Sequence, residues 1–168
     1  MAEQGAFSPE EWAVLSDTPL AACAAVALAD EGGGEREATA LLMGWREAGR
    51  LFPKSALVQM LVQNADPQER ALSEQPGQAA GRSQRTTYED IRAEALSMCQ
   101  RAVRLLERRA SPQDLEDYRN FVLFLASRVA RANSEARLLG GGDRVSPIER
   151  AMLREIAAVL GEAPEQSG

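Results

Sequence analysis

Residues 111–139 read SPQDLEDYRNFVLFLASRVARANSEARLL and decide the fold class. Apolar residues recur here at alternating steps of three and four positions: Leu115, Tyr118, Val122, Leu125, Val129, Ala132, Ala136 and Leu139. This spacing is typical of an α-helix with one apolar face. Further apolar bulk at Phe121, Leu123 and Phe124 predicts that neighbours cover this helix on more than one side. We therefore expect it to be the central helix of the protein.

In the segment immediately upstream, apolar residues recur at the same alternating steps of three and four positions. Its apolar stripe consists of Tyr88, Ile91, Ala95, Met98, Ala102 and Leu105. The two striped segments are joined only by Arg109-Ala110-Ser111. Two successive helices with a short turn predict a long antiparallel hairpin, 88–109 with 112–139, packed in the manner of a coiled coil.

Helix starts are marked by a small hydroxyl or acidic residue followed by proline. Such pairs occur at Ser8-Pro9, Asp66-Pro67, Ser111-Pro112 and Ser146-Pro147, and Thr18-Pro19 is a weaker version. The first residue of each pair can cap the backbone N–H groups, and proline suits the first helical position. With an acidic residue three positions after the cap, the pattern becomes a capping box. These boxes predict helices along the whole chain.

The remaining helices complete an all-α, single-domain bundle of about seven helices. We expect them at 8–16, 19–31, 35–51, 54–64 and 147–160, the last ending at Gly161 as a C-cap. Residues 1–72 form the N-terminal helical half, 73–86 a flexible linker, 87–161 the C-terminal half and 162–168 a disordered tail. The linker either divides two units or connects halves of one shared core, and we favour the shared core.

Composition narrows the function classes. The net charge of −6 argues against nucleic-acid binding, which requires a basic face. The longest apolar run, Leu20–Ala29, is too short to span a bilayer. The start, MAEQGAFSPEE, lacks the basic and apolar regions of a secretory signal. Two isolated cysteines, Cys23 and Cys99, fit a reducing compartment, so we expect a cytoplasmic protein.

The two ends of the chain resemble each other. Each has a Ser-Pro helix start, a long helix, a glycine run and a further helix. Equivalent residues in the long helices are offset by 103 positions, and those in the following helices by 112. The likeness predicts an internal pseudo-repeat, and a chance likeness of two alanine-rich segments is the alternative.

These repeated segments resemble the tellurite-resistance TerB-like family of helical proteins. The family pattern is Ala-x-Ala-Asp-Gly-x-Ile, then Glu and Leu at four-residue steps. The first copy here is Ala27-Leu28-Ala29-Asp30-Glu31-Gly32-Gly33-Gly34-Glu35-Arg36-Glu37, with Leu41 following. The second is Gly141-Gly142-Asp143-Arg144-Val145-Ser146-Pro147-Ile148-Glu149, with Leu153 following. Glu31 and Gly33 depart from the pattern in the first copy, and Gly142-Asp143 inverts Asp-Gly in the second.

The resemblance implies ion binding through the acidic residues of the motif. Asp30 and Glu37 keep the family's spacing. In the second copy only Glu149 matches an acidic position of the family pattern. Carboxylates beside a glycine-rich loop can supply oxygen ligands to Ca²⁺ or Mg²⁺. The alternative interpretation of this segment is a helix C-cap, a glycine loop, and acids that favour the next helix N-terminus.

No catalytic apparatus is recognisable. The chain has no histidine, and Cys23 lies in an aliphatic run where its thiol should be unreactive. Cys99 lies near Arg101, so partial activation is the alternative to packing. Trp12 and Trp45 anchor the N-terminal helices or mark a partner surface.

We therefore predict a non-enzymatic, TerB-like, stress-associated protein that binds metal weakly at Asp30 and Glu37. The alternatives are a helical protein–protein interaction module, a homo-oligomeric scaffold, or an enzyme using carboxylates alone.

Overall fold

The computed structural model describes residues 7–30, 35–64, 87–137 and 145–161. Within these ranges it contains helices and no strand, so the all-α prediction is confirmed. The six helices are α1 (Pro9–Ala27), α2 (Glu35–Leu51), α3 (Ala56–Asn64), α5 (Tyr88–Arg109), α6 (Pro112–Arg137) and α7 (Pro147–Leu160). The predicted linker 73–86, the tail 162–168 and the Asp66-Pro67 helix start lie outside the described residues.

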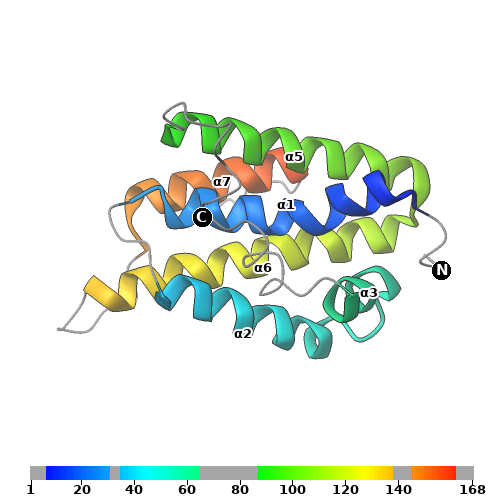
Figure 1. Ribbon diagram of the computed structural model, residues 1–168, viewed down its shortest axis with the longest axis horizontal. Coiled ribbons are helices and arrows are strands. Elements are labelled where there is room, and N and C mark those ends of the chain that lie inside the picture. Colours follow the sequence, from blue (N-terminus) through cyan, green and yellow to red (C-terminus); the bar gives the residue numbers. More distant parts are fainter. Residues whose placement is uncertain (1–6, 31–34, 65–86, 138–144, 162–168) are drawn as a thin grey trace, which may run out of the picture.

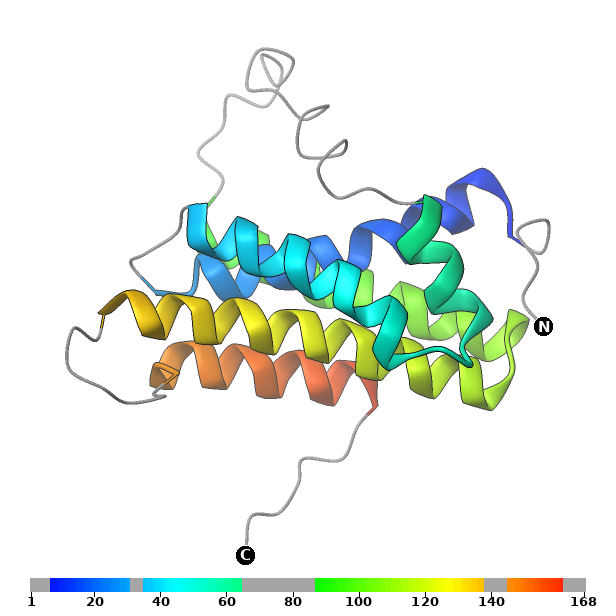
Figure 2. The same cartoon turned by 90° about the horizontal axis from the view of Figure 1, so that it is seen from below.

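The helices form a packed bundle (Figure 1). α1 and α6 run in one direction, α2, α5 and α7 run in the opposite direction, and α3 lies at one end. α6 contacts each of the other five described helices and is the central helix that its apolar bulk predicted. Seen from below, it lies between α2 and α7 (Figure 2).

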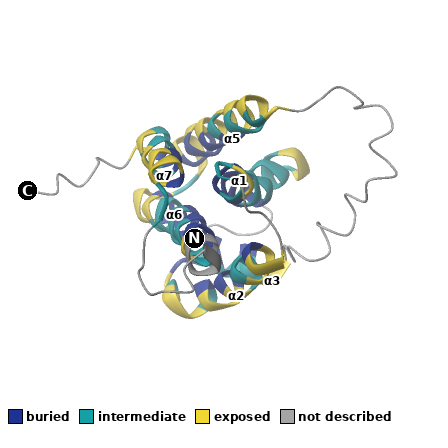
Figure 3. Ribbon diagram, turned by 90° about the vertical axis from the view of Figure 1, so that its left-hand side faces the viewer, coloured by how far each residue is buried: buried dark blue, intermediate teal, exposed yellow. Residues whose placement is uncertain are grey.

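The hairpin of α5 and α6 exists, but its packing differs from the prediction. The two helices run antiparallel and are joined by Ala110 and Ser111. However, α5 packs mainly against α1, and α6 packs mainly against α2 and α1. Figure 3 shows α1 between α5 and the layer that contains α6 and α2. The expectation that α5 and α6 pack mainly on each other like a coiled coil was wrong, because α1 covers most of the contact surface of α5 and α6 meets α2 and α1 more than it meets α5.

The predicted serine caps are confirmed at three helix starts. Glu11 N–H donates to Ser8 Oγ at 3.2 Å, and Ser8 N–H donates to the Glu11 carboxylate at 2.9 Å. Ser146 and Glu149 form the same capping box with the same two distances. At the start of α6, Asp114 N–H donates to Ser111 Oγ at 3.1 Å. These bonds satisfy backbone donors that a helix start would otherwise leave without partners.

The predicted helix break at Thr18-Pro19 is wrong. Pro19 lies buried inside α1, which continues to Ala27, so the two helices expected at 8–16 and 19–31 are one. A proline removes the N–H that would bond to the carbonyl four residues earlier, here that of Leu15. The hydroxyl of Tyr118, which is buried on α6, donates to the Leu15 carbonyl at 2.8 Å. A side chain from another helix therefore replaces the missing backbone donor.

This continuous helix also reduces the expected number of helices. About seven were expected, and six are present in the described part of the chain. The end of the last helix agrees with the prediction, because Gly161 caps α7 with a left-handed φ of 86°. Left-handed backbone favours glycine, which has no Cβ to clash.

The internal pseudo-repeat is not confirmed. α1 and α6 are both long helices that run in the same direction, as a repeat requires. The helices that follow them pack differently, because α2 lies mainly against α6 whereas α7 divides its contacts among α5, α6 and α1. The glycine segments 31–34 and 138–144 lie outside the described residues.

The buried side chains of the described helices form one hydrophobic cluster. Its largest fully buried members include Tyr118, Phe121, Leu106 and Ile156. Trp45 attaches α2 to this cluster, because its ring meets Phe121 edge-on with centroids 5.2 Å apart. α2 is thereby held on the outer side of α6, where it forms one wall of a groove.

Candidate functional site

The predicted metal ligands flank the first glycine segment. Asp30 is half-buried just after the end of α1, and Glu37 is 8% exposed in the first turn of α2. Both residues already have an interaction partner within the protein. Among the described residues, no group of three or more histidine, cysteine, aspartate or glutamate side chains is placed to hold a metal ion. The metal site therefore stays a prediction, carried by two carboxylates.

Glu149, the residue that carried over alone from the second motif, has a local structural role. Its side chain is 1% exposed, and its carboxylate accepts the N–H of Ser146 at 2.9 Å. It thereby caps the first turn of α7.

The two cysteines are placed for packing. Both are buried and free, Cys23 on α1 and Cys99 on α5. Burial raises the pKa of the Cys23 thiol far above its usual range and that of Cys99 to about 12. A thiol that stays protonated at neutral pH is a poor nucleophile. The activation of Cys99 by Arg101, left open by the sequence, is therefore not supported.

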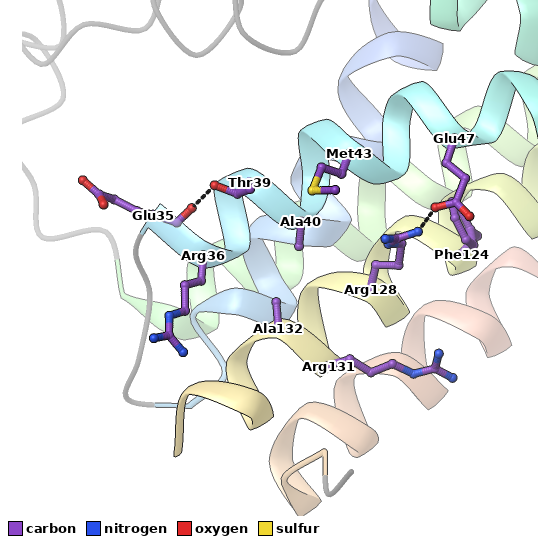
Figure 4. Close-up of a pocket in the computed structure, with 10 residues that line it drawn as sticks. All are labelled: Glu35, Arg36, Thr39, Ala40, Met43, Glu47, Phe124, Arg128, Arg131 and Ala132. Atoms are coloured by element: carbon purple, nitrogen blue, oxygen red, sulfur yellow. Dashed lines mark hydrogen bonds and ion pairs between the residues drawn. The ribbon is translucent and has the colours of Figure 1, made fainter. Parts of the chain in front are cut away.

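A groove lies between α2 and α6, with a volume of about 850 Å³ (Figure 4). It is lined by Glu35, Arg36, Thr39, Ala40, Met43, Glu47, Phe124, Arg128, Arg131 and Ala132. The α2 positions recur at steps of three and four, so they form one stripe along the helix. The α6 positions do the same. The groove therefore consists of two facing helical stripes from segments far apart in the sequence.

Gly44 lies on α2 at a tight contact with α6 beside this groove. A Cβ at Gly44 would lie 3.1 Å from Leu125 Cδ2 and 3.2 Å from Arg128 Cδ. A larger residue would therefore require these two side chains to move by a few tenths of an ångström. Glycine at this position lets α2 pack against α6 without that shift.

The centre of the groove is apolar. Ala40 on α2 and Ala132 on α6 are small, so they leave the space between the helices open. Met43 is 57% exposed, the highest fraction among the exposed large apolar side chains in the described chain. Phe124 is half-buried on the opposite wall. These two large apolar groups frame a surface that water covers only at a free-energy cost.

Charged side chains surround this centre, and arginine predominates. Arg128 forms an ion pair with Glu47, and its guanidinium lies 5.6 Å from the Phe124 ring centroid in a cation–π contact. Arg36 is exposed in the first turn of α2, whereas the side chain of Arg131 points away from that end of the groove (Figure 4). The carboxylate of Glu35 points away from the other lining side chains. The groove is therefore lined by three arginines and two glutamates in a chain whose net charge is −6.

Sequence reasoning did not identify this groove. It selected Asp30, which follows α1, and Glu37, which lies in the first turn of α2, but neither lines the groove. Trp45, considered as a partner surface, is 2% exposed and belongs to the core. Met43 and Arg128 lie on helices whose pairing no local pattern reveals.

Comparison with known proteins identifies no relative. The chain matches no known family model, and neither a curated protein nor a solved structure matches it. The resemblance to TerB-like proteins therefore stays a prediction from the two motif copies. Among the helices of the described residues, none combines the length and the apolar character needed to cross a bilayer.

Proposed function

We propose that this protein is a non-enzymatic helical interaction module that binds another protein through the α2–α6 groove. The observation that carries the proposal is an open groove with exposed Met43 on its α2 wall and half-buried Phe124 on its α6 wall. Apolar groups framed by charged ones on an outer surface are typical of protein-binding sites. The core of the bundle does not need Met43, because Trp45 and Phe121 attach α2 to α6.

The chemistry of the described residues supports a binding role over catalysis. Neither cysteine is exposed, and burial raises the pKa of both thiols. The chain has no histidine, the commonest general base at neutral pH. The hydroxyl of Tyr118 is committed to a backbone carbonyl inside the core.

Affinity purification with three tagged forms of the full chain tests this function. The forms are the wild type, Met43→Asp in the groove and Leu51→Asp as a control on the same helix. Met43 and Leu51 are similarly exposed, at 57% and 50%, but only Met43 lines the groove. We expect a protein recovered with the wild type and the control to be lost with Met43→Asp. Recovery that is equal for all three forms would reject the groove as the binding surface.

The homo-oligomeric scaffold is the second form of the interaction hypothesis. Light scattering coupled to size-exclusion chromatography measures it directly with the same three forms. A dimer that dissociates with Met43→Asp and not with Leu51→Asp would mean that a second copy of the chain occupies the groove.

Weak metal binding of the TerB-like type is a second candidate function, associated by that resemblance with stress. It is favoured by the burial of the ionisable side chain of Glu37, which follows the glycine segment in the sequence just as Asp30 precedes it. A bound ion stabilises the folded state, so Ca²⁺ or Mg²⁺ should raise the melting temperature of the wild type. It should not do so for the double variant Asp30→Asn/Glu37→Gln. An unchanged melting temperature in the wild type would remove this candidate.

A further inference from the structure

We propose that two copies of this chain associate through the outer face of α5, with the two α5 helices side by side and antiparallel. The inference concerns a second surface and does not depend on the α2–α6 groove. Two observations carry it: the order of the charges along α5, and the absence of partners for the inner charges within the described part of the chain.

The outer face of α5 carries one stripe of polar side chains. Figure 1 places α5 at an edge of the bundle, and Figure 3 shows exposed residues along its outer side. Six exposed residues recur there at alternating steps of four and three positions, as neighbours on one helix face do. They are Asp90, Glu94, Ser97, Arg101, Arg104 and Arg108. The stripe is therefore acidic towards the start of the helix and basic towards its end.

This order of charges is self-complementary. Each acid has an arginine at the same distance on the other side of position 99. Glu94 and Arg104 are each five positions from it, and Asp90 and Arg108 are each nine. A second α5 that is turned end for end about this level places every acid of the stripe beside an arginine of the other copy. Such a contact uses the same surface on both copies, as a two-fold symmetric dimer requires.

The centre of the stripe also fits this register. Ser97 and Arg101 are each two positions from the same level, so Ser97 of one copy faces Arg101 of the second copy. The serine side chain is short and leaves room for the long arginine. Its hydroxyl oxygen can accept a hydrogen bond from the guanidinium group.

The helix dipole does not account for the inner charges of the stripe. It favours acids in the first turn and arginines in the last, which covers Asp90 and Arg108. Glu94, Arg101 and Arg104 lie beyond these two turns, where the effect of the dipole has fallen off. Within the described part of the chain, the side chains of these three residues form no ion pair or hydrogen bond. They are therefore available to a second copy.

The outer pair of the stripe is partly engaged within its own chain. One carboxylate oxygen of Asp90 accepts the N–H and the hydroxyl of Thr87, at 2.9 Å and 2.8 Å. Arg108 Nε donates to the Arg104 carbonyl at 3.1 Å. The second oxygen of a carboxylate and the terminal nitrogens of a guanidinium can each form further bonds. The inner pair, Glu94 with Arg104, carries most of the proposed attraction because both side chains lack partners in the described chain.

An interface of this kind is weak and depends on salt. One helix face from each copy is small beside stable interfaces, which bury about 1,200–2,000 Å². Exposed ion pairs contribute little individually, and each is screened by salt. The Debye length falls from about 10 Å at 0.1 M salt to about 3 Å at 1 M. We therefore expect a reversible dimer at low salt that dissociates as the salt concentration rises.

Sedimentation velocity of the purified full chain tests the inference. The weight-average sedimentation coefficient of the wild type should rise with protein concentration at low salt and stay at the monomer value at about 1 M salt. Arg104→Glu and Glu94→Arg each replace attraction by repulsion at two symmetric places. Each should therefore weaken self-association about tenfold or more.

The sharpest measurement mixes these two single variants. Arg104→Glu has acids at both inner positions and Glu94→Arg has arginines at both, so one copy of each restores both contacts. We expect the mixture to associate although neither variant does so alone. Both variants keep a net negative charge, so overall charge attraction does not explain this result. The double variant Glu94→Arg/Arg104→Glu should associate as the wild type does.

The control reverses an exposed charge on another helix. Arg46→Glu on α2 changes the net charge as much as Arg104→Glu does, and it should leave self-association unchanged. Circular dichroism spectra of all variants establish that the fold is retained. A wild type that stays monomeric at low salt, or a mixture no more associated than its components, would overturn the inference. Association that is lost with Met43→Asp and unaffected by the α5 variants would overturn it as well and place the contact in the α2–α6 groove.

Discussion

The two sides of α6 differ in how completely their side chains are buried and hydrogen-bonded. On the side facing α1, Tyr118 is fully buried and its hydroxyl bonds to the Leu15 carbonyl. On the side facing α2, half-buried Phe124 and Arg128 border an open groove. One continuous helix therefore contributes both to a closed interior and to an incompletely covered surface.

This contrast distinguishes stability from recognition. The interior side contributes to the free energy of folding because its apolar groups leave water and its polar groups find partners when the chain folds. The groove side gains little from folding alone, since its side chains still contact solvent. Substitutions on the interior side should therefore change stability, whereas substitutions on the groove side should change binding.

The largest expected effect is that of Phe121→Ala. Phe121 is fully buried and contacts the rings of Trp45, Phe52 and Tyr118, so its removal leaves a cavity at the centre of the bundle. We expect a loss of about 3–5 kcal/mol in the free energy of unfolding, measured by urea denaturation. The matched variant Phe124→Ala, in the groove, should cost clearly less. Equal losses would contradict the difference between the two sides of α6.

A smaller loss is expected for Tyr118→Phe. This change leaves the Leu15 carbonyl buried without a donor, which costs about 1–3 kcal/mol. In a Pro19→Ala background, the backbone N–H restored at position 19 can bond to that carbonyl. Tyr118→Phe should then cost less, and a double-mutant cycle measures the coupling. A coupling energy of zero would mean that the tyrosine hydroxyl does not compensate for the proline.

Local sequence patterns predicted the parts of the fold that local bonds determine. The caps at Ser8, Ser111 and Ser146 depend on residues three positions away, so they could be located from the sequence. Pro19 could not be interpreted in the same way. Its place inside α1 depends on Tyr118, which is 99 positions further along the chain. Proline removes a donor, and only the tertiary structure shows whether another group supplies one.

The same reason explains why the candidate site was missed. The groove lies where α2 packs against α6, and the packing partner of α2 is not encoded in the periodicity of either helix. The expectation of coiled-coil packing between α5 and α6 failed for this reason as well, although the antiparallel hairpin itself is present. An apolar stripe shows that a helix face is buried, but it does not identify the helix that covers it.

The pH dependence of stability should reveal a polar contact at the edge of the α1–α5 interface. Hydrogen bonds from Arg109 and from the Ser8 backbone hold the pKa of Glu11 below its usual value of 4.5. A carboxyl group with a lowered pKa stabilises the fold above its unfolded pKa, and this contribution is lost as the pH falls through the folded value. Arg109→Ala should therefore reduce the loss of melting temperature below about pH 4.5. Arg101→Ala, at an exposed position on the same helix, is the control and should leave the acid profile unchanged.

The smallest expected effect on stability is that of Met43→Asp, and it separates binding from folding. Met43 and Leu51 are exposed to nearly the same extent on α2, so both Asp substitutions carry little packing cost. Their free energies of unfolding should agree within about 0.5 kcal/mol, the scatter of ordinary surface substitutions. Paired urea denaturation curves measure the difference. A much larger loss for Met43→Asp would make Met43 part of the core, and reduced binding by that variant would then reflect a damaged fold. Agreement between the two curves, with binding lost only for Met43→Asp, assigns the effect to the groove.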